Sequence, residues 1–414
     1  MSDWYEMPRA LAALPINDEK PAQDAILKPL AAAVFLIFFT GYMVAPLIPS
    51  LSREFSVGVQ QIGWLVPAYM LTYGFSTLFY GPLSDRIGRK PVLLTLIGAF
   101  IGVTLAAAFA WSFASLIAAR ILSGLCAGGI LPIILALIGD LYPYERLGRP
   151  MGWMFGAVAG GVAFGSTMGA WLNPFLGWRR EFMLLAAAQI AVFLVVYRRR
   201  HLLNSPAKAR LGAGQLALGY WALVSNARGS SVYGLIFLNG AFHSGILSWL
   251  GYYLFHRFDL SDERIGQTLL GYGIPGMLLG PTFGRLADRF GRRRIIPLGF
   301  VVASLSAVAL VSREPLWAVT AAITCLSVGF DMSHPLMAGI VASLDPKRRG
   351  QAMGLNAFAI FTGFGMGSLA FQVLMQSGLS LALVAFAAVQ MGLAGVALYV
   401  FRAERPAAGA AVER

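Results

Sequence analysis

The sequence predicts an all-α membrane protein with twelve transmembrane helices, arranged as two six-helix bundles that are parallel repeats of one another. Three observations lead to this prediction: the composition, a series of long apolar stretches and an internal repeat. Of the 414 residues, 57% are hydrophobic and only 12% are charged, whereas soluble domains carry about 25% charged residues. So few charges cannot cover the surface of soluble domains of this total length. The composition therefore excludes a soluble enzyme, a nucleic-acid-binding domain and a disordered scaffold.

The apolar stretches predict the individual helices. A helix needs about 20 mostly apolar residues to cross the hydrocarbon core of a bilayer. Stretches of this kind cover residues 30–50, 62–82, 91–111, 113–138, 151–172, 182–198, 231–255, 266–284, 295–312, 316–340, 351–375 and 379–401. The chain then divides into a polar tail (1–27), a first bundle (28–198), a linker (199–230), a second bundle (231–401) and a short tail (402–414). Residues 1–27 lack the pattern of a signal peptide and are expected to form a cytoplasmic tail.

The basic residues predict the orientation. The net charge is +13, and in multi-pass membrane proteins basic residues gather in the cytoplasmic loops. With the N-terminus inside, the cytoplasmic segments hold 25 of the 32 lysines and arginines, and the outer loops hold six. We therefore expect both termini in the cytoplasm, with the chain in a bacterial inner membrane. We attribute the positive net charge to the cytoplasmic loops that set the topology, and not to binding of nucleic acid.

The internal repeat begins with the segment after the second stretch. Residues 81–90 read GPLSDRIGRK, and residues 284–293 read GRLADRFGRR, 203 positions later. Ile62 and Gly63 match Ile265 and Gly266 at the same offset, and residues 148–152 match 350–354 at an offset of 202. Parallel halves of this kind are typical of transporters whose substrate site lies between the halves near the bilayer midplane.

At these residues the sequence resembles the major facilitator superfamily. The family pattern between spans two and three is G-x-L-[AS]-D-R-x-G-R-[KR], and residues 81–90 and 284–293 both fit it. A second family pattern, R-x-x-x-G on the fourth span, is matched by Arg120 and Gly124. The resemblance covers residues 30–401 and implies a fold of twelve transmembrane helices.

A third pattern, G-x-x-x-G-P-x-x-G-G, occurs on the fifth span of antiporters in this family. The chain has Gly161, Gly165 and Gly169 at three of its glycine positions, but Ser166 replaces the proline and Ala170 replaces the last glycine. The resemblance is therefore to drug:proton antiporters, with this departure on the fifth span.

The resemblance also implies that the repeated loops latch the two halves together when the central cavity faces outward. Asp85 and Asp288 are then the latch carboxylates, and Arg89 and Arg292 are their partners. Asp140, at the end of the fourth span, is placed to extend this charge network. The alternative is that the arginines only set the topology. The latch residues expected are Gly81, Asp85, Arg86, Gly88, Arg89, Gly284, Asp288 and Arg292.

A polar side chain inside a span costs free energy, so its presence there indicates a functional site. Asp331 and His334 share one face of the tenth span, and Asn239 and His243 share one face of the seventh. A carboxylate beside an imidazole can change protonation when water access alternates. We therefore expect Asp331 to carry a coupling proton, with His334 and His243 as its partners. The alternative is a hydrogen-bonded network that only fixes helix packing.

The substrate cavity is expected between spans one, four, seven and ten, as the resemblance implies. The first span carries an aromatic stripe that includes Phe38, which favours a substrate with apolar or planar parts. Arg120 is interpreted as an anion or proton-relay partner beside the cavity, or as an arginine that pairs with carbonyl groups and holds the first half together. The residues expected at the cavity are Phe35, Phe39, Tyr42, Arg120, Asn239, His243, Asp331 and His334.

These observations predict a secondary active transporter that works by alternating access and exports a small amphiphilic organic compound in exchange for protons. The chain is not expected to be an enzyme or to need a cofactor, and it has no ATP-binding loop of the G-x-x-x-x-G-K-[ST] type. We expect a monomer whose partners are the substrate, protons and the lipid bilayer. Two alternatives remain: uptake of a small polar solute, and transport of a divalent transition metal by Asp331, His334 and His243.

Overall fold

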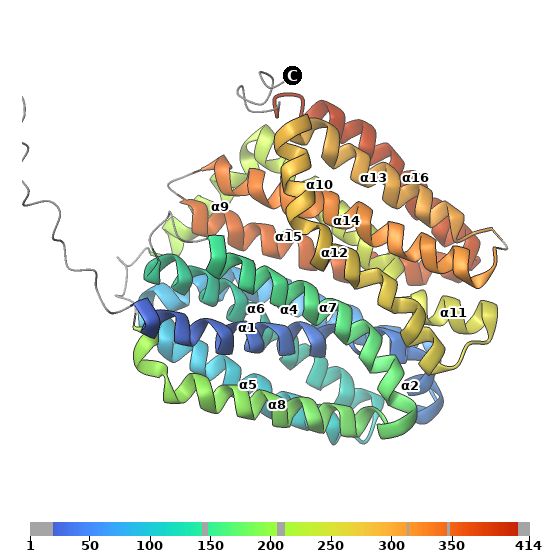
Figure 1. Cartoon of the computed structure of the whole chain (residues 1–414), viewed down its shortest axis with the longest axis horizontal. Helices are drawn as coiled ribbons and strands as arrows, with labels where there is room; N and C mark the ends of the chain where they lie inside the picture. The colour runs from blue at the N-terminus through green and yellow to red at the C-terminus, as the bar shows by residue number, and fades with distance from the viewer. Residues whose placement is uncertain (1–19, 143–147, 205–211, 313, 346–347, 405–414) are drawn as a thin grey trace, which may run out of the picture.

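The computed structural model describes residues 20–142, 148–204, 212–312, 314–345 and 348–404. All regular secondary structure in these ranges is helical (Figure 1). The first half contains α1 (Lys20–Tyr42), η2 (Ala45–Leu47), α2 (Ile48–Phe55), α3 (Val59–Gly63), α4 (Leu65–Ile87), α5 (Arg89–Ala108), α6 (Phe113–Leu141), α7 (Gly148–Leu176), α8 (Trp178–Arg198) and η4 (Arg200–Leu203). The second half contains α10 (Ala227–Leu247), α11 (Leu250–Phe258), α12 (Asp262–Phe290), α13 (Arg292–Ala309), α14 (Leu316–Leu344), α15 (Arg349–Met375) and α16 (Leu379–Val400), and α9 (Ala213–Ser225) lies between the halves in sequence.

Each predicted span coincides with one helix or with consecutive short helices, so the predicted fold class is confirmed. Within the described ranges, 8 helical segments are long and apolar enough to cross a membrane by length and composition alone. The predicted spans outside this set are α4, α10, α12 and α13. Two of them lie between the halves, where α4 packs on α15 and α12 packs on α7. A helix that faces protein on several sides can carry more polar residues than one that faces lipid.

The two halves repeat each other in packing as well as in sequence. α1 packs on α7 as α10 packs on α15, α4 on α6 as α12 on α14, and α5 on α8 as α13 on α16. The backbone turns also recur: every described residue with a positive φ has a counterpart 203 or 201 residues away. These pairs are Ser56 and Asp259, Gly88 and Gly291, and Gly177 and Gly378. Gly88 and Gly291 form the tight turns of the repeated loops, where a side chain would strain the backbone.

The halves meet along two seams, α4 against α15 and α7 against α12. Figure 1 shows the first half, in blue to green, beneath the second half, in yellow to red, with α2 and α11 at the same end of the molecule. We call this end the distal end, because α1 begins and α16 ends at the opposite, terminal end. In the predicted topology the distal end faces outward and the terminal end faces the cytoplasm.

The glycines of the fifth span form a packing seam between α1 and α7. A Cβ atom at Gly165 would lie 2.6 Å from the carbonyl oxygen of Phe39, and one at Gly161 would lie 2.6 Å from that of Phe35. Gly169 repeats the arrangement one turn later. Small residues spaced by four let two helix backbones approach closely. In this chain the antiporter-like glycine pattern therefore sets how closely α7 packs on the first span.

The linker contains a helix that the sequence did not predict. α9 packs on α10 and α15. The Tyr220 hydroxyl donates a hydrogen bond of 3.2 Å to the Leu78 carbonyl on α4, and Gly219 packs on the Gln351 side chain of α15. α9 therefore contacts both halves at the terminal end, beside the α4–α15 seam.

Candidate functional site

Four polar side chains from three helices form a cluster in the second half. His243 on α10 is buried, and the Tyr272 hydroxyl on α12 lies 2.6 Å from its Nδ1 and 3.1 Å from its Nε2. The His243 ring stacks on Phe330 with ring centroids 3.7 Å apart, and Phe330 stacks on His334 at 5.2 Å. Phe330 thus lies between the two histidines. We call Asp331, His334, His243 and Tyr272 the polar cluster.

Asp331 joins this cluster through its neighbours on α14 and α12. The Ser327 hydroxyl donates a hydrogen bond of 3.0 Å to Asp331 Oδ2, and the carboxylate interacts electrostatically with Tyr272. Among the described residues Asp331 forms no ion pair, and the buried Nδ1 of His334 has no hydrogen-bond partner. The structure therefore places Asp331, His334 and His243 around Tyr272 and Phe330, and Tyr272 is the member of the cluster that sequence reasoning missed.

Asn239 lies outside the polar cluster. It is fully buried, and its Nδ2 donates to Ser333 Oγ on α14 at 3.3 Å. Gln390 on α16 donates from Nε2 to Asn239 Oδ1 at 2.9 Å. These contacts connect three helices of the second half, so Asn239 takes part in helix packing and not in the arrangement around His243.

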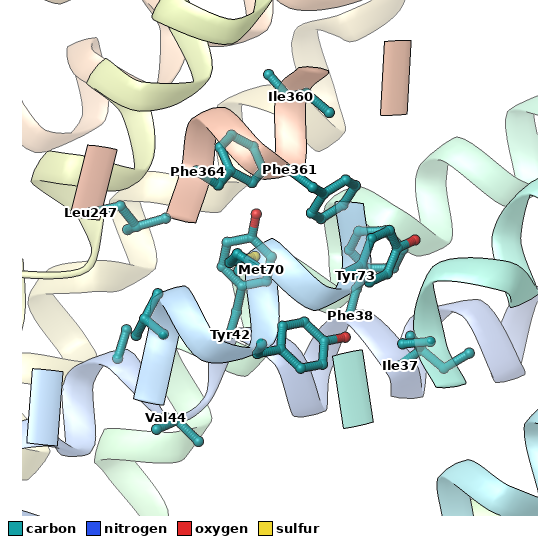
Figure 2. Packing of buried hydrophobic residues seen from close by; sticks show 14 of the residues in the cluster. Ile37, Phe38, Tyr42, Val44, Met70, Tyr73, Leu247, Ile360, Phe361 and Phe364 are labelled. Atoms are coloured by element: carbon teal, nitrogen blue, oxygen red, sulfur yellow. The ribbon is translucent and has the colours of Figure 1, made fainter. Parts of the chain in front are cut away.

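A row of aromatic side chains connects the polar cluster to the first half. Figure 2 shows Phe361 and Phe364 of α15 above Tyr42, Met70, Tyr73 and Phe38 of the first half. Tyr73 and Phe361 stack with centroids 3.8 Å apart, Phe361 and Phe364 are 5.3 Å apart, and Phe364 and His243 are 5.4 Å apart. We call Phe38, Tyr73, Phe361, Phe364 and Phe330 the aromatic row. It crosses the α4–α15 seam, and the buried hydroxyl of Tyr73 has no hydrogen-bond partner among the described residues.

The predicted cavity residues of the first span fall on different faces of α1. Phe35 and Phe39 are 5.9 Å apart, and Phe35 lies 6.2 Å from Phe164 on α7, so both occur at the α1–α7 seam. Tyr42 is buried and interacts electrostatically with Tyr272 of the second half. Of these three residues, Tyr42 is the one that the structure places beside the polar cluster.

Arg120 is buried in the first half. Its guanidinium donates to the carbonyl oxygens of Thr40 at 3.1 Å and Gly41 at 2.9 Å, and to that of Leu65 at 3.4 Å. It also lies over the Tyr69 ring at 4.3 Å. α1 ends at Tyr42, and the last carbonyls of a helix have no partner within it. Arg120 supplies that partner, which agrees with the interpretation that it pairs with carbonyl groups and holds the first half together.

The predicted latch is an ion-pair network within the first half. Arg89 is buried, with its Nε 2.7 Å from Asp140 Oδ2 and its Nη2 3.5 Å from Asp85 Oδ1. The Asp85 side chain is 45% exposed, and no ion pair between described residues joins it to the second half. The structure thus pairs Arg89 with Asp140 as well as Asp85, and it does not bring Asp85 to Arg292.

The other predicted latch residues are placed as follows. Arg86 is exposed at the end of α4. Nothing lies close to the positions that Cβ atoms would occupy at Gly81 and Gly284, whereas Gly88 forms a turn with φ +105°. Arg292 lies near Gly339 of its own half. Asp288 belongs to α12, but its side chain lies outside the described part of the structure.

The halves are joined directly at the distal end. The Ser50 hydroxyl and the Asn173 amide, both from the first half, donate to the same oxygen of Asp262 on α12, at 2.5 and 2.8 Å. Trp249 of the second half packs on Gly63 of the first, where a Cβ atom would clash at 2.6 Å. We call Ser50, Asn173 and Asp262 the distal gate; in this structure both of its hydrogen bonds are formed.

The donor set for a metal ion is not assembled. Within the described ranges, no three His, Cys, Asp or Glu side chains gather closely enough to hold a metal. His243 is instead engaged by Tyr272 and by the Phe330 ring. The structure therefore gives no support to a metal site made of Asp331, His334 and His243.

Comparison with known families agrees with this geometry. The family model described as Major Facilitator Superfamily matches residues 30–279 and 232–414. The chain belongs to the major facilitator superfamily. As a superfamily member it is a multi-pass membrane transporter, as the sequence and the two repeated bundles predict.

Individual relatives cover most of the chain at low identity. The uncharacterized MFS-type transporter YceJ of Bacillus subtilis is 27% identical over 338 residues, which are 81% of this chain and 86% of that protein. The quinolone resistance protein NorA of Staphylococcus aureus is 24% identical over 334 residues, 80% of this chain and 84% of that protein. The human organic anion transporter MFSD10 (TETRAN) shares the fold, with a TM-score of 0.72 and 17% identity over 93% of this chain and 100% of that one.

Proposed function

We propose that this superfamily member exports planar, amphiphilic organic compounds in exchange for protons, by alternating access. The observation that carries the proposal is the contact between the polar cluster and the aromatic row, which crosses from one half to the other. Substrate bound at the row and a proton bound at the cluster would then act on side chains that contact each other. The name of the relative NorA, a quinolone resistance protein, supports export of a planar compound.

The aromatic row supports recognition of a planar substrate. Aromatic pairs gain about 0.5–1.5 kcal/mol beyond area burial, and a cationic substrate gains a similar amount over a ring face. Tyr73 and Phe361 come from different halves and stack on each other. A planar molecule inserted at this pair would replace a contact between the halves with its own contacts to both, and would therefore sense their relative position.

The polar cluster supports proton coupling. The described contacts of Asp331 are a hydroxyl donor and nearby aromatic groups, so protonation of its carboxylate breaks no ion pair. His334 has an unpartnered ring nitrogen within the same cluster. Groups of this kind can exchange protons with water when the half–half interface opens on either side. The hydrogen bonds of the distal gate and the partly exposed Asp85 support an inward-facing conformation for this structure.

The test is transport in proteoliposomes with an imposed pH gradient, with ethidium as a planar aromatic cation. We expect the gradient to drive ethidium movement opposite to proton movement. Asp331→Asn should reduce this gradient-driven rate at least tenfold while the protein stays folded. Asp259→Asn is the matched control, because Asp259 is exposed and asparagine tolerates its left-handed backbone, with φ 51°.

Three results would contradict the proposal. Undiminished coupling in Asp331→Asn would remove the proton role of Asp331. Ethidium movement in the same direction as protons would replace export with symport. An equal loss in Asp259→Asn would show that the change acts on folding and not on coupling.

A further inference from the structure

α12 makes polar contacts at two levels along its length, one at the distal gate and one at the polar cluster. Near its first turn, Asp262 accepts hydrogen bonds from Ser50 and Asn173 of the first half. Ten residues later, Tyr272 bonds to His243 in the polar cluster. At 1.5 Å per residue these two contacts are about 15 Å apart along the helix axis.

We propose that α12 couples the polar cluster to the distal gate, with Tyr272 as the positioning residue at the cluster and Asp262 as the gate residue. This inference rests on the proposed proton-coupled transport and adds the path by which the proton acts on the gate. No role was predicted for either residue from the sequence.

The hydrogen bond at Tyr272 changes direction when His243 takes up a proton on Nδ1. A neutral imidazole offers one accepting nitrogen and one donor, whereas a protonated imidazole has two donors. The Tyr272 hydroxyl lies 2.6 Å from Nδ1, so it donates to that nitrogen when the neutral ring carries its proton on Nε2, and it accepts from it when the ring is protonated. The titratable groups facing this pair are Asp331 and His334 of α14 and Tyr42 of α1; from α15 the ring of Phe364 faces it.

α12 is built to transmit such a change along its axis. α12 is one continuous helix from Asp262 to Phe290. The seventh span, in contrast, is interrupted after Leu247, between α10 and α11. On one side α12 packs on α14, which carries Asp331, and on the other side it packs on α7 of the first half. A Cβ atom at Gly266 would lie 2.7 Å from the Thr167 carbonyl of α7, so a shift of α12 moves directly against the first half.

The distal gate lies beside a second acidic side chain. Hydrogen bonds to a carboxylate are strong, and Asp262 Oδ2 accepts two of them. The buried Glu181 of α8 interacts electrostatically with Asp262, and its Oε1 has no hydrogen-bond partner among the described residues. The other charged residues around the gate are Arg53 and Glu54 of α2, and Glu263 and Arg264 of α12.

The test measures distances between spin labels in lipid nanodiscs over a pH series from about 4 to about 8, which covers the range in which carboxyl and histidine groups titrate. Cys126 and Cys325 are first replaced by alanine. The exposed Trp111 and Trp317 are then changed to cysteine to report on the distal end, and the exposed Tyr197 and Tyr399 report in the same way on the terminal end.

In the otherwise unchanged protein we expect the distal distance distribution to respond to pH, with an opposite response at the terminal end. Tyr272→Phe should abolish that response or shift its midpoint by at least one pH unit, without lowering the thermal unfolding midpoint. Tyr252→Phe on α11 is the matched control and should respond normally. Asp262→Ala should lengthen the distal distance at every pH of the series.

A normal pH response in Tyr272→Phe, or an unchanged distal distance in Asp262→Ala, would overturn the coupling role of α12. The coupling role would also be overturned if the wild-type protein exchanges ethidium for protons but its distal distance does not respond to pH. In that case the proposed function would stand. If proteoliposomes show no proton-driven transport at all, the proposed function fails and this inference fails with it.

Discussion

Two buried arginines stabilise the first half in different ways. Arg120 donates to backbone carbonyls at the end of α1 and beside the start of α4, and Arg89 pairs with Asp140 and Asp85 at the terminal end. A guanidinium can serve several acceptors at once because its donors form a rigid planar fork. Each arginine therefore connects segments that are distant in sequence.

Arg120→Lys should destabilise the protein although it keeps the charge. A lysine cannot reach the Thr40, Gly41 and Leu65 carbonyls together, and each lost hydrogen bond to a charged group costs about 1.5–3 kcal/mol. Thermal unfolding in detergent should show a midpoint several degrees lower. If the midpoint stays the same and transport is lost, Arg120 acts in the transport cycle and not in helix capping.

Arg89→Ala should destabilise the first half more than Arg86→Ala does. Removing one partner of a buried ion pair costs about 3–5 kcal/mol, whereas an exposed charge contributes within about 0.5 kcal/mol. Chemical unfolding of the two variants gives the comparison. Equal stability would mean that the Arg89–Asp140 pair contributes nothing measurable.

Sequence spacing singled out Asp331, His334 and His243 as polar candidates in the second half, but it did not indicate which aromatic residues surround them. Asp331 and His334 stand out because polar groups are rare within apolar spans. Tyr272 and Phe361 do not, because the chain has 14 tyrosines and 28 phenylalanines. Only the packing of α12 and α15 decides which of these rings meet His243 and Tyr73.

At the scale of helices, close packing depends on small residues at fixed spacing. The α1–α7 seam places Gly161 and Gly165 against backbone carbonyls, and the α10–α15 seam repeats this with Gly363 and Gly367. Hydropathy predicted the spans because it depends only on length and apolar content. It did not predict the break between α1 and α2 or the helix α9, because a break leaves the apolar content unchanged and α9 is too short to span a membrane.

Gly165→Ala should weaken the α1–α7 seam, whereas Gly156→Ala on the same helix should not. A Cβ atom at position 165 meets the Phe39 carbonyl oxygen at 2.6 Å, but nothing lies within 4 Å of the one at 156. Overpacking of this kind costs about 1–3 kcal/mol, and alanine in an open helix position gains up to about 1 kcal/mol. Thermal unfolding of the two variants should therefore move in opposite directions; equal shifts would argue against close backbone packing at this seam.

At the scale of the whole molecule, the two halves are held together at the distal end by contacts along α7 and α12 as well as by the distal gate. Met168 of α7 and Gln267 of α12 line the same cavity of about 220 Å³ in this seam, together with Thr167, Trp171 and Leu270. If transport requires the distal ends to separate, these two positions must move apart in each cycle.

Cross-linking this seam should therefore stop transport. Met168→Cys and Gln267→Cys, in a background without Cys126 and Cys325, should be joined by a short bifunctional methanethiosulfonate reagent, which attaches to each cysteine through a disulfide. We expect ethidium transport to fall to the level of empty liposomes and to return after reduction, while each single-cysteine variant is unaffected by the reagent. Full transport by the cross-linked protein would show that the halves do not separate here.

The helix α9 has a consequence for how a lipophilic molecule would approach the centre of the protein. Through Tyr220 and Gly219, α9 contacts α4 and α15 together at the terminal end, and the exposed Leu218 and Trp221 extend its apolar surface outward. No described segment covers the α7–α12 side in the same way. Entry from the leaflet on the terminal side should thus occur at one seam, because α9 covers the α4–α15 seam and the described helices leave the α7–α12 seam facing the membrane.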